Sequence, residues 1–259
     1  MEHFPRRSDA ESTGGVTGRG GGADAAGAPI TPLDLPQGCR DVVLFGGTFD
    51  PPHRWHMRGP MQIAHAVGAC LLVVPAAKNP LKATGPVASD EDRVAMVRLA
   101  LDAATAGSEF HHGVLVWTDE IDRAKWARDR GLTTPSFTID TVRRLRVVVG
   151  AGVRLRMIIG VDQALKFHEW RDYRDLMELA EPIVMPRDGV GTSAQLERAI
   201  AETGAWSAEE AAKWGERLAK VDMVPIASTH VREAIKRGEA SSQLDVSVQR
   251  YVEERGLYR

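Results

Sequence analysis

A glycine-rich segment with two histidines contains the residue types that most directly suggest chemistry. It covers residues 46–56 and reads Gly-Gly-Thr-Phe-Asp-Pro-Pro-His-Arg-Trp-His. Glycines lack a Cβ, so the backbone can approach an anion closely, and the N–H groups of such a turn can bind anion oxygens. His53 and His56 lie three positions apart, which puts both side chains on one side of a helix start and adds donors there. The segment therefore predicts a nucleotide phosphate site.

A strand before the segment and a helix after it must position these groups. An apolar run covers residues 42–45, and helical spacing runs over 57–67, although Gly59-Pro60 interrupts its start. This arrangement places the turn's N–H groups at the end of a sheet, where they can hold an anion.

Two later turns follow predicted strands in the same way. One contains Gly160 and Asp162, and the other contains Ser228 and Thr229. The carboxyl ends of parallel strands lie along one edge of a sheet, and ligands bind there, near the point where the strand order reverses. We therefore expect the three turns to converge on one crevice.

Short apolar runs alternate with helical periods over most of the chain. Strands are predicted at 41–45, 71–74, 114–117, 155–160, 182–186 and 221–226. Helices are predicted at 57–67, 89–104, 139–148, 193–203, 208–219, 231–237 and 246–254, the second with a capping box from Ser89 to Asp92 and the third capped by Ser136 or Thr138. The pattern predicts an α/β fold with a Rossmann-like, doubly wound parallel sheet, in a single domain over residues 39–259.

Residues 1–38 differ from the rest of the chain in composition. Glycine and alanine are frequent and apolar bulk is scarce, so burial would not compensate the entropy of ordering. We expect a disordered tail there.

The remaining composition excludes several classes of protein. A net charge of −2 gives no electrostatic reason for binding nucleic acid or an anionic membrane. No apolar run approaches the ~20 residues of a membrane span, and the N-terminus lacks the apolar core of a signal peptide. Cys39 and Cys70 match no metal or disulfide spacing, which favours a reducing cytoplasm. We expect a soluble intracellular protein.

The 46–56 segment resembles the first signature of the nicotinate-nucleotide adenylyltransferases, whose superfamily motif is His, any residue, Gly, His. Four further blocks agree with that family in order, at residues 79–82, 135–141, 160–170 and 227–232. The resemblance extends from about residue 40 to the end of the chain. It implies a nucleotidyltransferase domain that transfers an adenylyl group from ATP to nicotinate mononucleotide, giving deamido-NAD and pyrophosphate.

The resemblance also implies roles for individual residues. The catalytic residues would be His53, His56 and Arg232, and the ATP-binding residues Gly46, Gly47, Thr48, Phe49, Gly160, Asp162, Ser228 and Thr229. Nicotinate mononucleotide would be bound by Lys82, Phe137, Thr138 and Trp170. Mg²⁺ would be carried by the ATP phosphates, so no protein metal site is expected. The expected partners are ATP and nicotinate mononucleotide, and the sequence is compatible with a homo-oligomer.

Simpler structural roles remain open for several of these residues. Asp162 could be a helix N-cap instead of a ribose ligand, and Trp170 could be core instead of a stacking surface for the pyridine ring. Arg232 could belong to an ordinary capped helix, and Lys82 could be a charge on a loop.

Three positions depart from the family pattern. Trp55 replaces the glycine between the two histidines, Ala227 replaces a serine and Phe137 replaces a tyrosine. Because Trp55 is large, three hypotheses stay open: an active enzyme on nicotinate mononucleotide, a transferase with another acceptor such as nicotinamide mononucleotide or pantetheine phosphate, and a nucleotide-binding protein with impaired catalysis. The direction of the Trp55 side chain bears on all three.

Overall fold

The centre of the fold is a parallel sheet whose strand order reverses next to its first strand. The computed structural model describes residues 23–24, 27–77, 85–108, 110, 112–132, 135–187, 189–222, 228–239 and 241–259. The sheet strands in this part are β1 (Asp41–Gly47), β2 (Cys70–Pro75), β3 (Val114–Val116), β4 (Arg154–Gly160) and β5 (Glu181–Met185). Their order is β3-β2-β1-β4-β5, with every neighbouring pair parallel. The crevice expected at such a reversal lies between β1 and β4.

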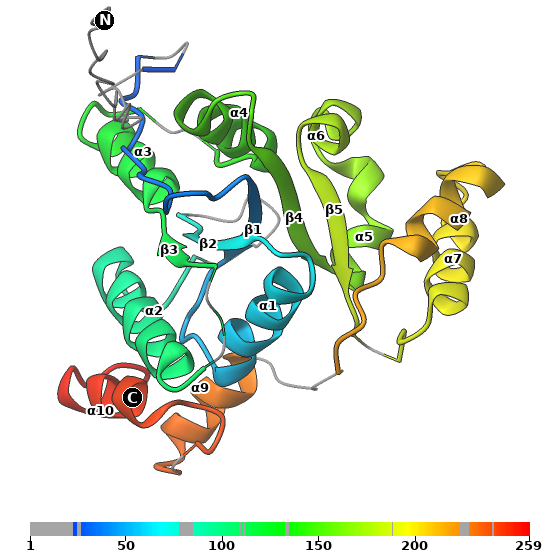
Figure 1. Cartoon of the computed structure of the whole chain (residues 1–259). Helices are drawn as coiled ribbons and strands as arrows, with labels where there is room; N and C mark the ends of the chain where they lie inside the picture. Colours follow the sequence, from blue (N-terminus) through cyan, green and yellow to red (C-terminus); the bar gives the residue numbers. More distant parts are fainter. Residues whose placement is uncertain are drawn as a thin grey trace, which may run out of the picture.

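Helices cover both faces of the sheet (Figure 1). One face carries α1 (Arg54–Ala66), α2 (Asp90–Thr105) and α10 (Val246–Glu254). The other carries α4 (Thr138–Val149), α5 (Val161–Leu165), α6 (Tyr173–Leu179), α7 (Ser193–Glu202) and α8 (Ala208–Glu216), with a 3₁₀ turn at Phe167–Glu169. The remaining helices in the described residues are α3 (Asp119–Arg128) and α9 (Ser228–Lys236), and none of them is long and apolar enough to cross a membrane.

Alternation along β1 separates the two cores. Val42 and Leu44 pack with α4 on one face, whereas Val43 and Phe45 pack with α1 and α2 on the other. Because both faces of the central strands are buried, their sequences are continuously apolar instead of alternating. This confirms the predicted doubly wound α/β fold.

The predicted elements agree with the structure, with two qualifications. The first five predicted strands are present, whereas the sixth, at 221–226, falls mainly on residues 223–226, which lie outside the described part. The charged stretch after β3 forms the helix α3, which buries Ile121 and Ala127 beneath its charged surface.

The N-terminal boundary of the domain differs from the prediction. Ala28 and Ile30 are buried, and Ile30 belongs to the core that contains α4. The indole N–H of Trp117 donates to the carbonyl of Thr31 at 2.9 Å. The ordered domain therefore includes residues from the predicted tail, because Ala28 and Ile30 pack into its core. Residues 1–22 lie outside the described part.

A buried ion pair fastens this N-terminal segment. The guanidinium of Arg144 donates from Nε and Nη2 to the two carboxylate oxygens of Asp119, at 2.6 and 2.8 Å. It also donates to the backbone carbonyls of Ala28 and Pro29. The N–H of Thr31 donates to the same Asp119 carboxylate at 2.8 Å. Arg144 on α4 and Asp119 on α3 thus hold the segment through its backbone.

The cysteines are paired, contrary to the prediction. Cys39 and Cys70 form a disulfide, with their Cα atoms 6.3 Å apart. They are 31 positions apart in sequence, so no local spacing marks them. The register of β1 on β2 places Cys70 beside Val42 and thereby close to Cys39. The predicted reducing compartment rested on the lack of a disulfide spacing, and the pairing of the cysteines takes that support away.

Replacing Arg144 with methionine should strongly destabilise the protein. The Arg144→Met variant leaves the Asp119 carboxylate buried without its cation, so we expect the free energy of unfolding in urea to fall by about 3–5 kcal/mol. Arg143→Met is the matched control. Arg143 is the preceding residue, its side chain is 45% exposed against 4% for Arg144, and its ion pairs are with the exposed Asp172 and Asp175. The control should lose less than about 1 kcal/mol; equal losses would contradict the assigned role of the buried pair.

Candidate active site

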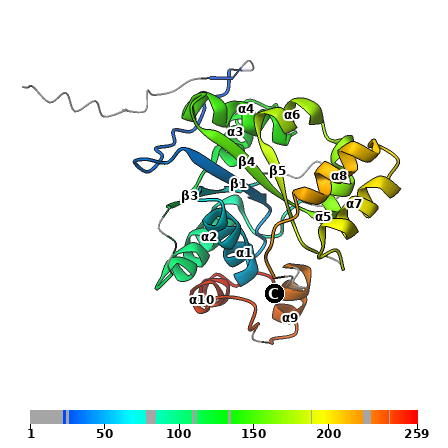
Figure 2. The ribbon, with the colours of Figure 1, turned by 45° about the vertical axis from the view of Figure 1, so that its right-hand side comes forward.

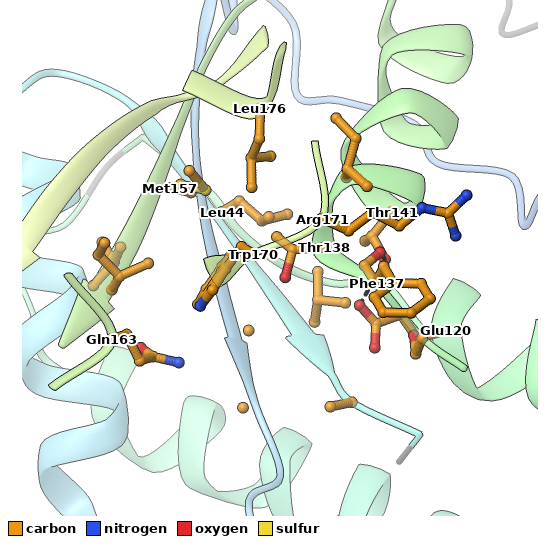
Figure 3. A pocket seen from close by; sticks show the side chains of 18 of the residues that line it. Leu44, Glu120, Phe137, Thr138, Thr141, Met157, Gln163, Trp170, Arg171 and Leu176 are labelled. Carbon is orange, nitrogen blue, oxygen red and sulfur yellow. Dashed lines mark hydrogen bonds between the residues drawn. The ribbon is translucent and has the colours of Figure 1, made fainter. Parts of the chain in front are cut away.

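A cavity of about 210 Å³ opens at the carboxyl ends of β1 and β4. Six of the sequence-predicted site residues line it: Gly46, Gly47, Thr48, Phe137, Thr138 and Trp170. Figure 3 shows Trp170 and Gln163 on one side of the cavity and Phe137, Thr141 and Glu120 on the other. The structure therefore brings together the turn after β1, the start of α4 and the segment after β4. Of the turns expected to converge on one crevice, the turn that contains Ser228 and Thr229 does not line this cavity.

Trp170 is both a wall of the cavity and a neighbour of the core. Its ring lies 5.0 Å from the ring of Phe167, which is fully buried. Its indole N–H is buried and has no hydrogen-bond partner among the described residues. A flat, partly exposed indole of this kind offers a surface on which a planar ring can stack.

The N-terminus of α4 faces the same cavity. Its N-cap is Phe137, whose side chain makes no capping hydrogen bond, so the predicted cap from Ser136 or Thr138 is wrong. The Ser136 hydroxyl instead accepts a hydrogen bond from Arg123 at 3.0 Å. The first-turn N–H groups of α4 and the positive end of its dipole thus favour an anionic group in the cavity.

Glu120 was not predicted as a site residue, although it lines the cavity. The Thr141 hydroxyl donates to its carboxylate at 2.6 Å, and burial raises the pKa of Glu120. A raised pKa favours the neutral acid, which limits repulsion of an anion. No local pattern marks Glu120, because its contact depends on how α3 packs against α4.

Arg171 is a second unpredicted residue of the cavity. Its guanidinium carbon lies 5.0 Å from the centre of the Phe137 ring, a cation–π contact. This exposed cation adds positive charge at the rim of the cavity.

The two histidines cap α1 reciprocally. The backbone N–H of His56 donates to Nδ1 of His53 at 3.2 Å, and the backbone N–H of His53 donates to Nδ1 of His56 at 3.1 Å. The rings stack with centroids 3.5 Å apart and planes 13° apart. Because each Nδ1 accepts, each neutral ring carries its proton on Nε2. The pair therefore presents two N–H donors, as the spacing predicts.

The surroundings of His53 keep it neutral. Its side chain is almost fully buried, and burial, with a further contribution from the positive charge of Arg187, lowers its pKa from 6.5 to about 4. Arg187 follows β5, and sequence reasoning did not select it. Its contribution shows that the end of β5 also borders the histidines.

Phe49 packs against the histidine pair through the ring of His56. Its side chain is only 2% exposed, and its ring makes an edge contact with the His56 ring at 5.4 Å. A Cβ on Gly47 would lie 2.8 Å from the Phe49 ring, so only glycine fits at position 47. The Phe49 side chain therefore offers no free surface to a nucleotide, which leaves its predicted ATP-binding role to the backbone of the turn.

Trp55 lies along α1, away from the cavity. Its indole is next to Gly59, where an added Cβ would approach ring atoms to 3.0 Å and the Met185 sulfur to 3.2 Å. Gly59, one helical turn after Trp55, thus leaves space for the Trp55 indole. Trp55 is absent from the residues that line the cavity.

Helix α9 docks on the turn after β1. Arg232 donates from Nη1 to the backbone carbonyl of Asp50 at 2.7 Å, and the Ser228 hydroxyl donates to the carbonyl of Pro51 at 3.0 Å. Nη2 of Arg232 lies 3.4 Å from the Thr229 hydroxyl, which accepts its hydrogen bond. The three predicted residues of α9 are therefore held beside the histidine turn.

The turn after β4 borders the other side of the crevice. Gly160 is the N-cap of α5, and its N–H donates a hydrogen bond to the Gln163 side-chain oxygen at 2.9 Å. Asp162 is exposed in the first turn of α5, so it is not the N-cap. Lys82 lies outside the described residues. Among those described, no group of three His, Cys, Asp or Glu side chains could hold a metal ion.

The family model described as cytidylyltransferase-like matches residues 44–234. A probable nicotinate-nucleotide adenylyltransferase of Yersinia enterocolitica is 31% identical over 223 residues, covering 83% of this chain and 94% of its own length. One of Chromobacterium violaceum is 30% identical over 229 residues, covering 84% and 98%.

The fold has solved counterparts. The nicotinic acid mononucleotide adenylyltransferase of Plasmodium falciparum, complexed with NaAD, superposes with a TM-score of 0.58 at 14% identity, covering 85% of this chain and 97% of its own. At that identity the likeness concerns the fold alone. The family model and the curated relatives, with which this fold agrees, place the chain, a nucleotidyltransferase, in the nicotinate-nucleotide adenylyltransferase family.

Proposed function

We propose that the protein transfers the adenylyl group of ATP to nicotinate mononucleotide, giving deamido-NAD and pyrophosphate. The observation that carries this proposal is the position of the reciprocally capped histidine pair at the end of β1, beside a cavity that combines an aromatic wall with an open helix N-terminus. The names of the relatives point to the same reaction.

The cavity suits an acidic pyridine ring. The ring would stack on Trp170, and its carboxylate would bind at the first-turn N–H groups of α4. The raised pKa of Glu120 and the cation of Arg171 both favour an anion there. These features support nicotinate over the neutral nicotinamide.

The histidine turn suits a triphosphate. In the proposed reaction a phosphate oxygen of nicotinate mononucleotide forms a bond to the α-phosphorus of ATP, and the bond to the pyrophosphate leaving group breaks. The Nε2–H groups of His53 and His56 would donate to phosphate oxygens, and Arg232 would bind the outer phosphates. Fixed donors of this kind stabilise the charge that develops on transferring phosphates. We propose that Mg²⁺ is carried by the ATP phosphates, since the two histidines and Arg232 at this turn serve as hydrogen-bond donors.

Purified protein with ATP, Mg²⁺ and nicotinate mononucleotide should release pyrophosphate. We expect kcat/KM for nicotinate mononucleotide to exceed that for nicotinamide mononucleotide by about tenfold or more, because the carboxylate gains a charged contact worth about 1.5 kcal/mol. Pantetheine phosphate is the third acceptor of the panel. Preference for either other acceptor would support the alternative of a different substrate, and no pyrophosphate release at high enzyme concentration would refute the proposal.

The depressed pKa of His53 predicts how stability changes with pH. Below its unfolded pKa of 6.5 and above its folded pKa of about 4, the unfolded state binds one more proton, so stability falls as the pH falls. Relative to a His53→Gln variant, the wild type should lose about 3 kcal/mol of unfolding free energy between pH 7 and pH 4. Urea denaturation at several pH values measures this difference; parallel curves would contradict a buried neutral His53.

Replacing Trp55 should have little effect on nicotinate mononucleotide. In Trp55→Gly we expect its KM to change by less than about threefold, because the indole lies along α1 and not in the cavity. Gly59→Ala should displace the indole and lower stability, and the double variant should regain that loss. A rise in kcat of about a hundredfold in Trp55→Gly would instead favour the hypothesis of impaired catalysis.

A further inference from the structure

The carboxylate of Asp50 links the phosphate turn to two segments that are distant in sequence, residues 87–88 and the C-terminal turn. It accepts hydrogen bonds from the backbone N–H groups of Val87 and Ala88 at 2.8 and 3.0 Å. It also accepts one from the hydroxyl of Tyr258 at 2.8 Å. Asp50 is only 5% exposed, so these bonds are made where water does not compete freely.

The last turn of the chain is built into this arrangement. Tyr258, the residue before the C-terminal one, is 4% exposed and packs in the core that contains α1 and α2. Burial and the negative charge of Asp50 raise its pKa, so the hydroxyl remains a donor. Figure 2 shows the C-terminus beside α9, the helix that carries Arg232.

Arg232 has two acceptors on the same residue. Its Nη1 donates to the backbone carbonyl of Asp50 at 2.7 Å and lies 3.9 Å from the carboxylate oxygen Oδ2. A charge-assisted bond to a carboxylate is stronger than one to a carbonyl. Other donors already satisfy this carboxylate: Oδ2, the oxygen nearest Arg232, accepts from Val87, and Oδ1 accepts from Ala88 and Tyr258.

We propose that Tyr258 is a positioning residue for the triphosphate: by satisfying the Asp50 carboxylate it leaves the Arg232 guanidinium available to the phosphates. This proposal rests on the proposed function, in which Arg232 binds the outer phosphates of ATP. In this proposal the C-terminal turn has a role in ATP binding. It has no role in the cavity proposed for the pyridine nucleotide, because other segments line that cavity.

The Tyr258→Phe variant removes only the hydroxyl. The Asp50 carboxylate then loses one donor and draws the Arg232 guanidinium toward it. We expect the KM for ATP and the dissociation constant for Mg-ATP to rise about tenfold, as for loss of one charged hydrogen bond, while the KM for nicotinate mononucleotide stays within about twofold. A purely structural role would lower stability without separating the two substrates.

Tyr251→Phe is the matched control. The Tyr251 hydroxyl also donates to a carboxylate, that of Asp92, at 2.9 Å, and it also lies in the C-terminal helix region. Asp92 belongs to α2, and in this variant its carboxylate still accepts hydrogen bonds from the Ser89 hydroxyl and from Arg255. Both variants should show similar small losses in melting temperature, and the control should leave both KM values within about twofold of wild type.

The test combines kinetics with Mg-ATP titration by calorimetry on the full chain. A selective loss of ATP affinity in Tyr258→Phe supports the proposal; unchanged ATP affinity, or an equal loss in Tyr251→Phe, overturns it while leaving the proposed function intact. If the wild type binds ATP but does not turn over nicotinate mononucleotide, the proposed function fails and the titration still decides the role of Tyr258. A wild type that does not bind ATP overturns both.

If the Tyr258→Phe variant does not fold, a measurement on the wild-type protein still tests the proposal. On addition of Mg-ATP, hydrogen–deuterium exchange should slow in residues 85–89 and 255–259, because bound phosphates hold Arg232 and with it the Asp50 junction. Exchange in α8, which packs against α7 and into the core that contains α4, serves as the internal reference. Unchanged exchange at both junction segments on ATP saturation overturns the proposal.

Discussion

The reciprocal cap between His53 and His56 is the interaction on which the site depends. A helix start needs acceptors for its free N–H groups, and here two imidazoles supply them in place of a hydroxyl or carboxylate. The same bonds decide the chemistry of the pair, because an Nδ1 that accepts leaves Nε2 as the donor. Burial then lowers the pKa of His53 and keeps its ring neutral. The bonds that cap the helix therefore also determine which ring nitrogens act as donors.

The rest of the fold holds this cap in place from far along the chain. Phe49 packs under the His56 ring, α9 donates to the carbonyls of the turn, and Tyr258 satisfies the carboxylate of Asp50. The contacts of α9 and of Tyr258 join segments that are remote in sequence, whereas Phe49 belongs to the same turn as the histidines. The turn after β1 is thus held by tertiary contacts made by the last third of the chain, whereas the cavity is lined mainly by the segments from β3 to α6.

Much of the architecture was predictable from local patterns. Apolar runs and helical spacing identified β1 to β5, and the reversal of strand order brought the predicted turns to one edge. Ser89 caps α2 as its spacing indicates. The boundary of the tail was placed too late because the apolar residues from Ile30 onward are few, and their burial depends on the buried pair of Arg144 and Asp119.

By itself, the sequence determined the α/β class, the strand-to-helix turn at residues 46–56 and the spacing that places two histidines at one helix start, because these follow from periodicities and backbone preferences that act over a few residues. Only the tertiary structure decided the pairing of Cys39 with Cys70, the approach of Glu120 to the cavity and the direction of Trp55 along α1. Those contacts are set by sheet register and by helix packing, and they depend on residues tens of positions apart that no local pattern links.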